Sequence, residues 1–236
     1  MNPLRLAAIA LLGFAVPASA GDPPKPWHEF KANEPIKLEP DKAYIFVRTV
    51  EMYGFRFVRI DGDNGAQVDR ENLVDLKGFQ SIDKSFPGQA HLLAVTPGTY
   101  WLYGVKTEYY LDGPWLNCLC MGTVRFTAKA GTITDLGTIR DIAYETRGGK
   151  RPDRRGKTHN LLGIRDDRAI QVEPVTDRDQ IPPAIQNMPR TAATYSAAGW
   201  LPNIDGTRID RISAMPGIIG YDRDRVVDTK TGKVYP

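Results

Sequence analysis

The sequence predicts a mainly β protein: an antiparallel β-sandwich with an irregular C-terminal extension that contains short helices and a terminal hairpin. Short runs of β-branched and aromatic residues are separated by turn residues, which is typical of such folds. The chain has 22 glycines and 18 prolines, which suits many turns between strands. Apolar residues make up 42% of it, enough for a sizeable core.

The strands are expected mainly in the first two thirds of the chain. Phe55 and Phe57 fall on one face of their segment and Arg56 on the other, as in a half-buried strand. Thr96-Pro97-Gly98 forms a turn, because proline presets φ and glycine accepts a positive φ. The expected strands are residues 35–38 (an edge strand), 44–49, 55–60, 91–95, 99–107, 122–127, 132–139 and 169–172.

The last third of the chain differs in character. Residues 147–157 are strongly basic and interrupted by glycines, which predicts a loop. Short helices are expected at residues 177–188 and 191–198, and a hairpin pairs residues 225–227 with 233–235. The expected organisation is a signal peptide (1–20), an extended segment (21–40), a β-sandwich domain (41–146), a basic linker loop (147–160) and a C-terminal extension packing on the sandwich (161–236).

The N-terminus has the three parts of a secretory signal peptide. Arg5 supplies a positive charge, residues 6–16 are almost wholly apolar, and Ala18-Ser19-Ala20 provides small residues for cleavage. The apolar run is too short for a transmembrane helix, which needs about 20 residues. We therefore expect cleavage after Ala20 and a soluble periplasmic or secreted protein without a transmembrane segment.

Two turn-and-strand motifs carry a resemblance to a known family. Residues 95–102, VTPGTYWL, are similar to the PG-x-Y-x-L turn and strand of carboxypeptidase-regulatory-like and related small β-sandwich domains of bacterial envelope proteins. Residues 124–139 resemble the hairpin of the same domains. The resemblance covers residues 44–139. It implies a non-catalytic fold and assigns no catalytic residue.

Cys118-Leu119-Cys120 is the sharpest chemical feature. Residues two apart on a regular strand are about 6.7 Å apart, the outer limit for a disulfide, so a bridge requires a local turn. Three interpretations compete: a reducible disulfide with a redox role, two thiolates for a soft metal such as Cu(I) or Zn, and a structural bridge or inert buried thiols. The structural interpretation is favoured, and no cofactor is expected unless the pair binds a metal.

Aromatic and basic residues form the candidate binding surfaces. If the aromatic residues are exposed together on one face, they make a platform for glycan or peptide ligands. The favoured interpretation is that they are buried in the core or pack at an interface. The basic loop would meet anionic envelope polymers or lipid headgroups, although a solvated loop is favoured. The residues in question are Trp101, Tyr103, Tyr109, Tyr110, Trp115, Arg151, Arg154 and Arg155.

Catalytic signatures are absent from the sequence. No nucleophile elbow, zinc-protease motif, phosphate-binding loop or dinucleotide fingerprint occurs. A net charge of +3 argues against a nucleic-acid binder. The leading hypothesis is therefore an exported non-enzymatic protein with a structural or binding role in the cell envelope, whose partner is an envelope protein or an anionic envelope polymer. The alternatives are a metal-binding or thiol-redox protein built on Cys118 and Cys120, and a hydrolase with His91 as its base.

Overall fold

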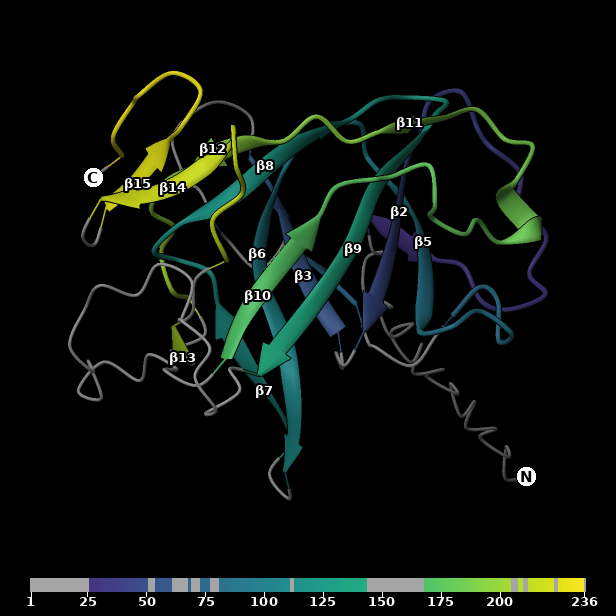
Figure 1. Cartoon of the computed structure of the whole chain (residues 1–236). Helices are drawn as coiled ribbons and strands as arrows, with labels where there is room; N and C mark the ends of the chain where they lie inside the picture. Colours follow the sequence, from purple (N-terminus) through teal and green to yellow (C-terminus); the bar gives the residue numbers. More distant parts are fainter. Residues whose placement is uncertain are drawn as a thin grey trace, which may run out of the picture.

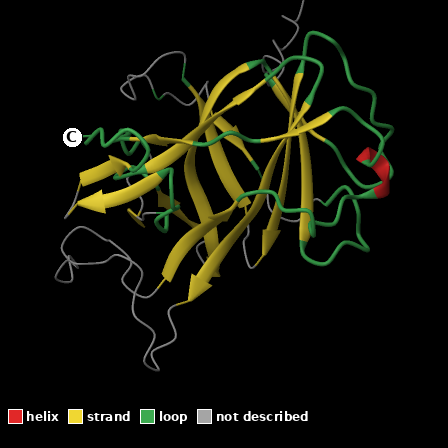
Figure 2. Cartoon of the chain, turned by 45° about the horizontal axis from the view of Figure 1, so that its top comes forward, coloured by secondary structure: helices red, strands yellow, loops and turns green. Residues whose placement is uncertain are grey.

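Strands and loops make up nearly all of the part of the protein that the structure describes (Figure 2). The computed structural model describes residues 26–50, 54–60, 68, 73–76, 81–110, 113–143, 168–204, 208–209, 212–222 and 225–235. Within these residues a 3-10 turn at Pro183–Ile185 is the one helical element. The mainly β prediction is confirmed.

The first sheet is mixed, and six strands form it within the described residues (Figure 1). β5 pairs antiparallel with β1 and β2, whereas β2 and β11 run parallel to β9. These parallel pairs contradict a wholly antiparallel fold. The strands are β1 (Trp27–Glu29), β5 (Gln89–Val95), β2 (Ala43–Val50), β9 (Ile133–Ala143), β10 (Arg168–Glu173) and β11 (Arg190–Ala192).

The second sheet is antiparallel apart from one two-residue strand. The long strand β6 pairs with β3 on one side. On its other side it pairs with β8 along its first half and with β7 along its second. The strands are β12 (Ser196–Ala198), β8 (Thr123–Ala128), β6 (Gly98–Tyr110), β3 (Gly54–Arg59), β4 (Leu73–Asp75), β7 (Gly113–Cys118) and β13 (Arg208–Ile209), which runs parallel to β7.

The two sheets face each other across one apolar cluster. Alternate residues of each strand point into it: Ile45 and Val47 from β2 meet Phe57 from β3 and Phe126 from β8. The Phe57 and Phe126 rings pack edge to face, with 5.5 Å between their centroids. This is the alternation expected for strands with one face in a shared core.

Loops cover the outer faces of both sheets. Tyr44, Phe46 and Leu92 on the outer side of the mixed sheet are buried under residues that include Phe30 and Ile185. On the outer side of the second sheet, Val58, Trp101 and Cys118 belong to another buried cluster. Every described residue of β2 from Ala43 to Thr49 is therefore buried, although it alternates between the two faces.

A bulge in β9 lies next to Asp135, a buried carboxylate of the first sheet. β2 pairs Phe46 with Asp135 and Arg48 with Thr138, so β9 has one extra residue between the two pairs. Gly137 sits in this bulge with φ of +79°, a conformation that glycine adopts without strain. Its backbone N–H donates to the Asp135 carboxylate at 2.9 Å.

A buried ion cluster fixes the connection that follows β10. Arg48 Nη2 donates to Asp135 Oδ1 at 2.9 Å and to Asp179 Oδ2 at 3.1 Å. Arg190 Nε lies 3.6 Å from Asp135 Oδ2. Charges removed from water need such partners, so the cluster holds the segment between β10 and β11 against the sheet.

The C-terminal third departs from its predicted elements. Residues 177–188 contain only the short 3-10 turn, and residues 191–198 contribute to β11 and β12 instead of a helix. These short segments pair with β9 and β8, so they are strands of the two sheets. The two-stranded hairpin is β14 (Ile219–Asp222) with β15 (Arg225–Asp228), and the predicted pairing of 225–227 with 233–235 appears as a bridge between Val227 and Val234.

The expected edge strand also lies elsewhere. Residues 35–38 form no strand; Ile36 and Leu38 pack instead against the outer face of the mixed sheet. The edge strand is β1, eight residues earlier in the chain at Trp27, where it pairs Trp27 with Val95 and Glu29 with Leu93. This placement brings the N-terminal segment to the end of β5, where the candidate site lies.

Candidate functional site

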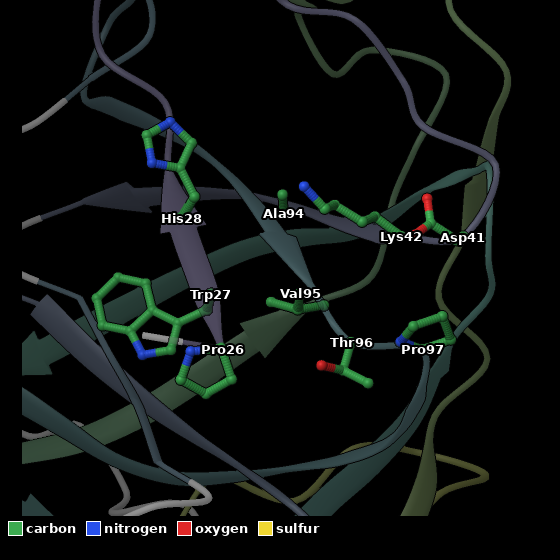
Figure 3. A pocket seen from close by; sticks show the side chains of 9 residues that line it. All are labelled: Pro26, Trp27, His28, Asp41, Lys42, Ala94, Val95, Thr96 and Pro97. Carbon is green, nitrogen blue, oxygen red and sulfur yellow. The ribbon is translucent and has the colours of Figure 1, made fainter. Parts of the chain in front are cut away.

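A pocket of about 400 Å³ opens at the end of β5 (Figure 3). Val95 lies between the two neighbouring strands at this point, because it pairs with Trp27 of β1 on one side and with Ala43 of β2 on the other. The turn after β5 adds further walls. A volume of this size lies within the usual range of ligand pockets, roughly 300–1,000 Å³. The lining residues are Pro26, Trp27, His28, Asp41, Lys42, Ala94, Val95, Thr96 and Pro97.

The sequence explains why these segments meet. β1 and β2 both pair antiparallel with β5. The start of β1 and the residues just before β2 therefore lie on either side of Val95. The turn that begins at Thr96-Pro97 then carries the chain into β6 in the second sheet. Trp27 is partly buried and packs against the core between the sheets. The pocket is thus built on strand ends held by the fold.

The two basic side chains of the pocket each lie beside a carboxylate. Lys42 Nζ donates to Glu39 Oε1 at 2.9 Å, and this hydrogen bond raises the pKa of Lys42. His28 Nε2 lies 2.6 Å from Glu34 Oε1. Burial acts to raise the pKa of Glu34, but hydrogen bonds from the Lys31 backbone and from His28 outweigh it and lower the pKa. With Asp41 also lining the pocket, three carboxylates lie around one lysine and one histidine, so the site has no positive excess.

A hydrogen-bonded chain of three side chains anchors β1 to the core. His91 is fully buried, with Nδ1 2.9 Å from Glu29 Oε1 and Nε2 3.3 Å from Thr49 Oγ1. Phe55 packs edge to face against its ring at 5.5 Å. Acid, imidazole and hydroxyl follow the order of a hydrolase triad. Thr49 is only 2% exposed, however, and a nucleophile must be reached by its substrate, so we assign this chain of contacts a structural role.

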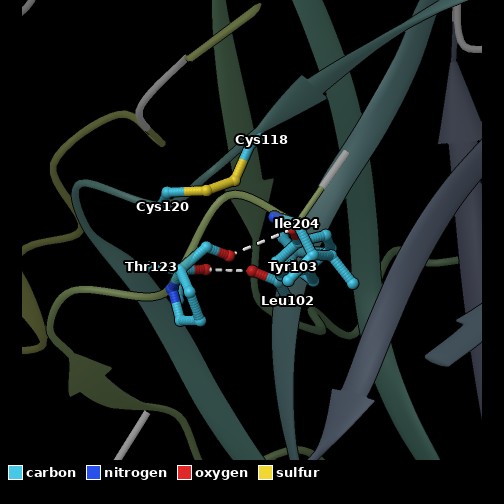
Figure 4. The surroundings of a disulfide bond; sticks show 7 residues. Leu102, Tyr103, Cys118, Cys120, Thr123 and Ile204 are labelled. Atoms are coloured by element: carbon cyan, nitrogen blue, oxygen red, sulfur yellow. Dashed lines mark hydrogen bonds between the residues drawn. A yellow bond between two sulfur atoms is a disulfide. The ribbon is translucent and has the colours of Figure 1, made fainter. Parts of the chain in front are cut away.

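Cys118 and Cys120 form a disulfide in a local turn (Figure 4). Their Cα atoms are 5.2 Å apart, closer than on a regular strand. The turn falls where the neighbour of β6 changes from β8 to β7. Leu119 N–H donates to Tyr103 O at 2.9 Å, and Leu201 N–H donates to Cys120 O at 2.9 Å. The bridge therefore closes a loop that is already held by the backbone.

The surroundings of this disulfide favour the structural interpretation. Cys118 is fully buried and Cys120 is 1% exposed. Thiol–disulfide exchange requires an attacking thiolate to reach a sulfur, and bridged sulfurs present no thiolate to a soft metal. Within the part of the chain that the structure describes, no three His, Cys, Asp or Glu side chains gather as a metal site. We therefore propose no redox or metal function for the pair.

The structure describes the side chains of two of the five predicted aromatic residues. Trp101 is 2% exposed and Tyr103 is fully buried, both in the cluster beside the disulfide. Tyr103 Oη donates to Pro202 O at 3.2 Å and accepts from Ile204 N–H at 3.0 Å (Figure 4). Tyr109, Tyr110 and Trp115 belong to β6 and β7, but their side chains lie outside the described part of the structure.

The basic candidates Arg151, Arg154 and Arg155 lie outside the described residues. The pocket was not predicted from the sequence, because residues 21–40 were expected to form an extended segment. One signal was available: Trp27 directly follows Pro26 in this segment. A tryptophan next to a proline-rich stretch indicates that the segment contacts the fold.

Comparison of the chain with protein-family models, with curated proteins and with solved structures found no match. Among the described residues, no helix has the length and apolar character needed to cross a membrane.

Proposed function

We propose that this chain is an exported, non-enzymatic β-sandwich protein that binds a component of the cell envelope through the pocket beside Trp27. The observation that carries the proposal is the pocket itself. It combines an aromatic ring with a few polar groups at a concave site, the usual composition of a ligand site.

The signal-peptide pattern of the N-terminus supports export, because its charged, apolar and small-residue parts occur in the required order. The structural context supports binding over catalysis. In the acid–imidazole–hydroxyl chain of Glu29, His91 and Thr49, the imidazole and the hydroxyl are buried. A general base or a nucleophile would need contact with a substrate.

Co-sedimentation with isolated envelope fractions tests the proposal. The mature chain is mixed with peptidoglycan sacculi or outer-membrane vesicles, and the bound fraction is measured over a range of protein concentrations. We expect the parent to bind one fraction saturably. Trp27→Ala should weaken this binding about tenfold, because aromatic anchors carry much of a site's binding energy.

Trp200→Ala is the matched control, since Trp200 is 56% exposed and does not line the pocket. It should bind as the parent does. Circular dichroism and thermal unfolding establish that each variant is folded, and Thr96→Ala, which alters an exposed pocket residue, is a second pocket variant. If the parent binds neither fraction, or if both pocket variants bind like the parent, the proposal is wrong.

A further inference from the structure

The pocket beside Trp27 has rigid apolar walls. Figure 3 shows the Trp27 indole on one side, with the rings of Pro26 and Pro97 and the side chain of Val95 also lining the cavity. Ring side chains lose little conformational freedom when a ligand binds, so they contribute contact area at low entropic cost. A ligand of this pocket therefore presents at least one flat apolar face.

The rim of the pocket both donates and accepts hydrogen bonds. Lys42 supplies an ammonium, Asp41 a carboxylate and Thr96 a hydroxyl. Figure 3 places Asp41 and Lys42 across the cavity from the Trp27 indole. An ammonium only donates, an ionised carboxylate only accepts, and a hydroxyl does both. The ligand therefore carries donors and acceptors close to its apolar face.

The charges of the site argue against an anionic ligand. Lys42 is paired with Glu39 at 2.9 Å, and His28 is paired with Glu34 at 2.6 Å. A phosphate or a carboxylate would have to compete with these carboxylates, and Asp41 on the same rim would repel it. An uncharged ligand would neither compete with Glu39 and Glu34 for the basic side chains nor be repelled by Asp41.

We infer that the pocket binds an uncharged saccharide, a short stretch of sugar rings stacked on Trp27 with their hydroxyls directed at Asp41, Lys42 and Thr96. A pyranose ring has a face of C–H groups and an edge of hydroxyls that donate and accept, which matches the walls and the rim together. This inference rests on the proposed binding function and specifies the ligand class of the same site.

A proline-rich peptide is the competing ligand, because aromatic-lined grooves also bind polyproline helices. Proline has no backbone N–H, so such a segment offers carbonyl acceptors but few donors. It would cover Asp41 without supplying a hydrogen-bond donor, and a desolvated carboxylate without a partner weakens binding. Sugar hydroxyls satisfy all three rim residues.

The test uses the folded mature protein on an array of neutral glycans that includes glucans, galactans and chitin oligosaccharides. Affinities for the best glycan and for decaproline are then measured by calorimetry. We expect at least one neutral glycan to bind. Trp27→Ala and Asp41→Asn should each weaken it, the former about tenfold, while Trp200→Ala, outside the pocket, should leave the affinity unchanged.

Three results would overturn the inference: no neutral glycan binds, a glycan binds with the same affinity to Trp27→Ala and Asp41→Asn as to the parent, or decaproline binds more tightly than any glycan in a Trp27-dependent way. Co-sedimentation separates this failure from that of the proposed function. Envelope binding that depends on Trp27 in the absence of glycan binding would reject the saccharide and keep the binding role.

Discussion

At the scale of single residues, the polar groups that matter most are those paired away from water. Asp75 of β4 is an example, since it accepts from Arg56 Nη2 at 3.1 Å and from Lys106 Nζ at 2.7 Å. Burial acts to raise the pKa of Asp75, but the two cationic hydrogen bonds outweigh it and lower the pKa below 3.8. The ionised carboxylate is therefore stabilised in the folded state.

This shift predicts an acid-dependent contribution to stability. A carboxylate whose pKa is depressed on folding stabilises the fold above its unfolded pKa, about 3.9, and this contribution is lost as the pH falls through the folded pKa. Asp75→Asn should lower the free energy of unfolding by about 1–2 kcal/mol at pH 7. In urea unfolding, parent and variant should converge as the pH falls through the folded-state pKa of Asp75.

Asp222→Asn is the control for Asp75, because its ion pair with Arg225 is 56% exposed on both sides and should contribute nothing measurable. A constant difference between the parent and Asp75→Asn at all pH values would show that the ionised carboxylate does not stabilise the fold.

The disulfide between Cys118 and Cys120 gives the second prediction at this scale. The cysteines are two positions apart, so the bridge closes a very small loop. The chain-entropy relation then gives about 1–2 kcal/mol of stabilisation. The double variant Cys118→Ala, Cys120→Ala should fold, unfold at lower urea by that amount, and keep the parent's affinity for envelope fractions. Loss of that affinity in a folded variant would give the cysteines a direct functional role.

At the scale of elements, the edge strand β1 is the part of the fold on which the pocket depends most. Only three residues of β1 pair with β5, and a strand so short gains little from its ladder alone. Glu29 fastens it to buried His91 at 2.9 Å, two residues from Trp27. The position of Trp27 therefore depends on a side-chain contact in the core.

Removal of this contact should destabilise β1. Glu29→Ala leaves Nδ1 of the buried His91 unpaired, which costs about 1–3 kcal/mol, and it should weaken ligand binding at the pocket. Glu29→Gln retains an oxygen acceptor, so its effect should be smaller. Urea unfolding measures the loss of stability, and amide hydrogen exchange in residues 27–29 measures the local opening of β1. Equal protection of β1 in parent and Glu29→Ala would contradict the anchoring role.

The elements also show how far the sequence predicts the structure. Runs such as 44–49 and 91–95 were recognised as strands because β-branched and aromatic residues fit a pleated, buried surface. The parallel pairing of β2 with β9 was missed, because their separation of some ninety residues leaves no local signal. Residues 191–198 were predicted to be helical, but their conformation is set by pairing with β9 and β8.

The candidate site was predicted less well than the fold. Trp101 and Tyr103 are typical core aromatics, and the alternative of burial that the sequence favoured describes them correctly. The pocket depends on three segments that meet at residues 93–95, since β1 and β2 both pair with β5 there. No spacing in the sequence brings Trp27, Asp41 and Thr96 together, so tertiary structure was needed to find them.

At the scale of the whole molecule, the account requires that the chain is exported and oxidised. The signal-peptide pattern predicts cleavage after Ala20. In an oxidising periplasm, the intact mass should correspond to a chain that begins at Gly21 and is lighter by two hydrogen atoms than its reduced form. A protein that retains residues 1–20, or that carries two free thiols, would contradict the expected compartment.

The central claim is that the pocket between β1 and the start of β2 is where this protein binds the envelope. The most direct test is backbone-amide chemical-shift mapping of the isotope-labelled mature protein during titration with the solubilised envelope fraction that it co-sediments with. The account predicts saturable shifts at residues 26–28, 41–42 and 94–97, with little change in the hairpin of β14 and β15. Shifts confined to other surfaces, or no shifts at saturating ligand, would contradict it.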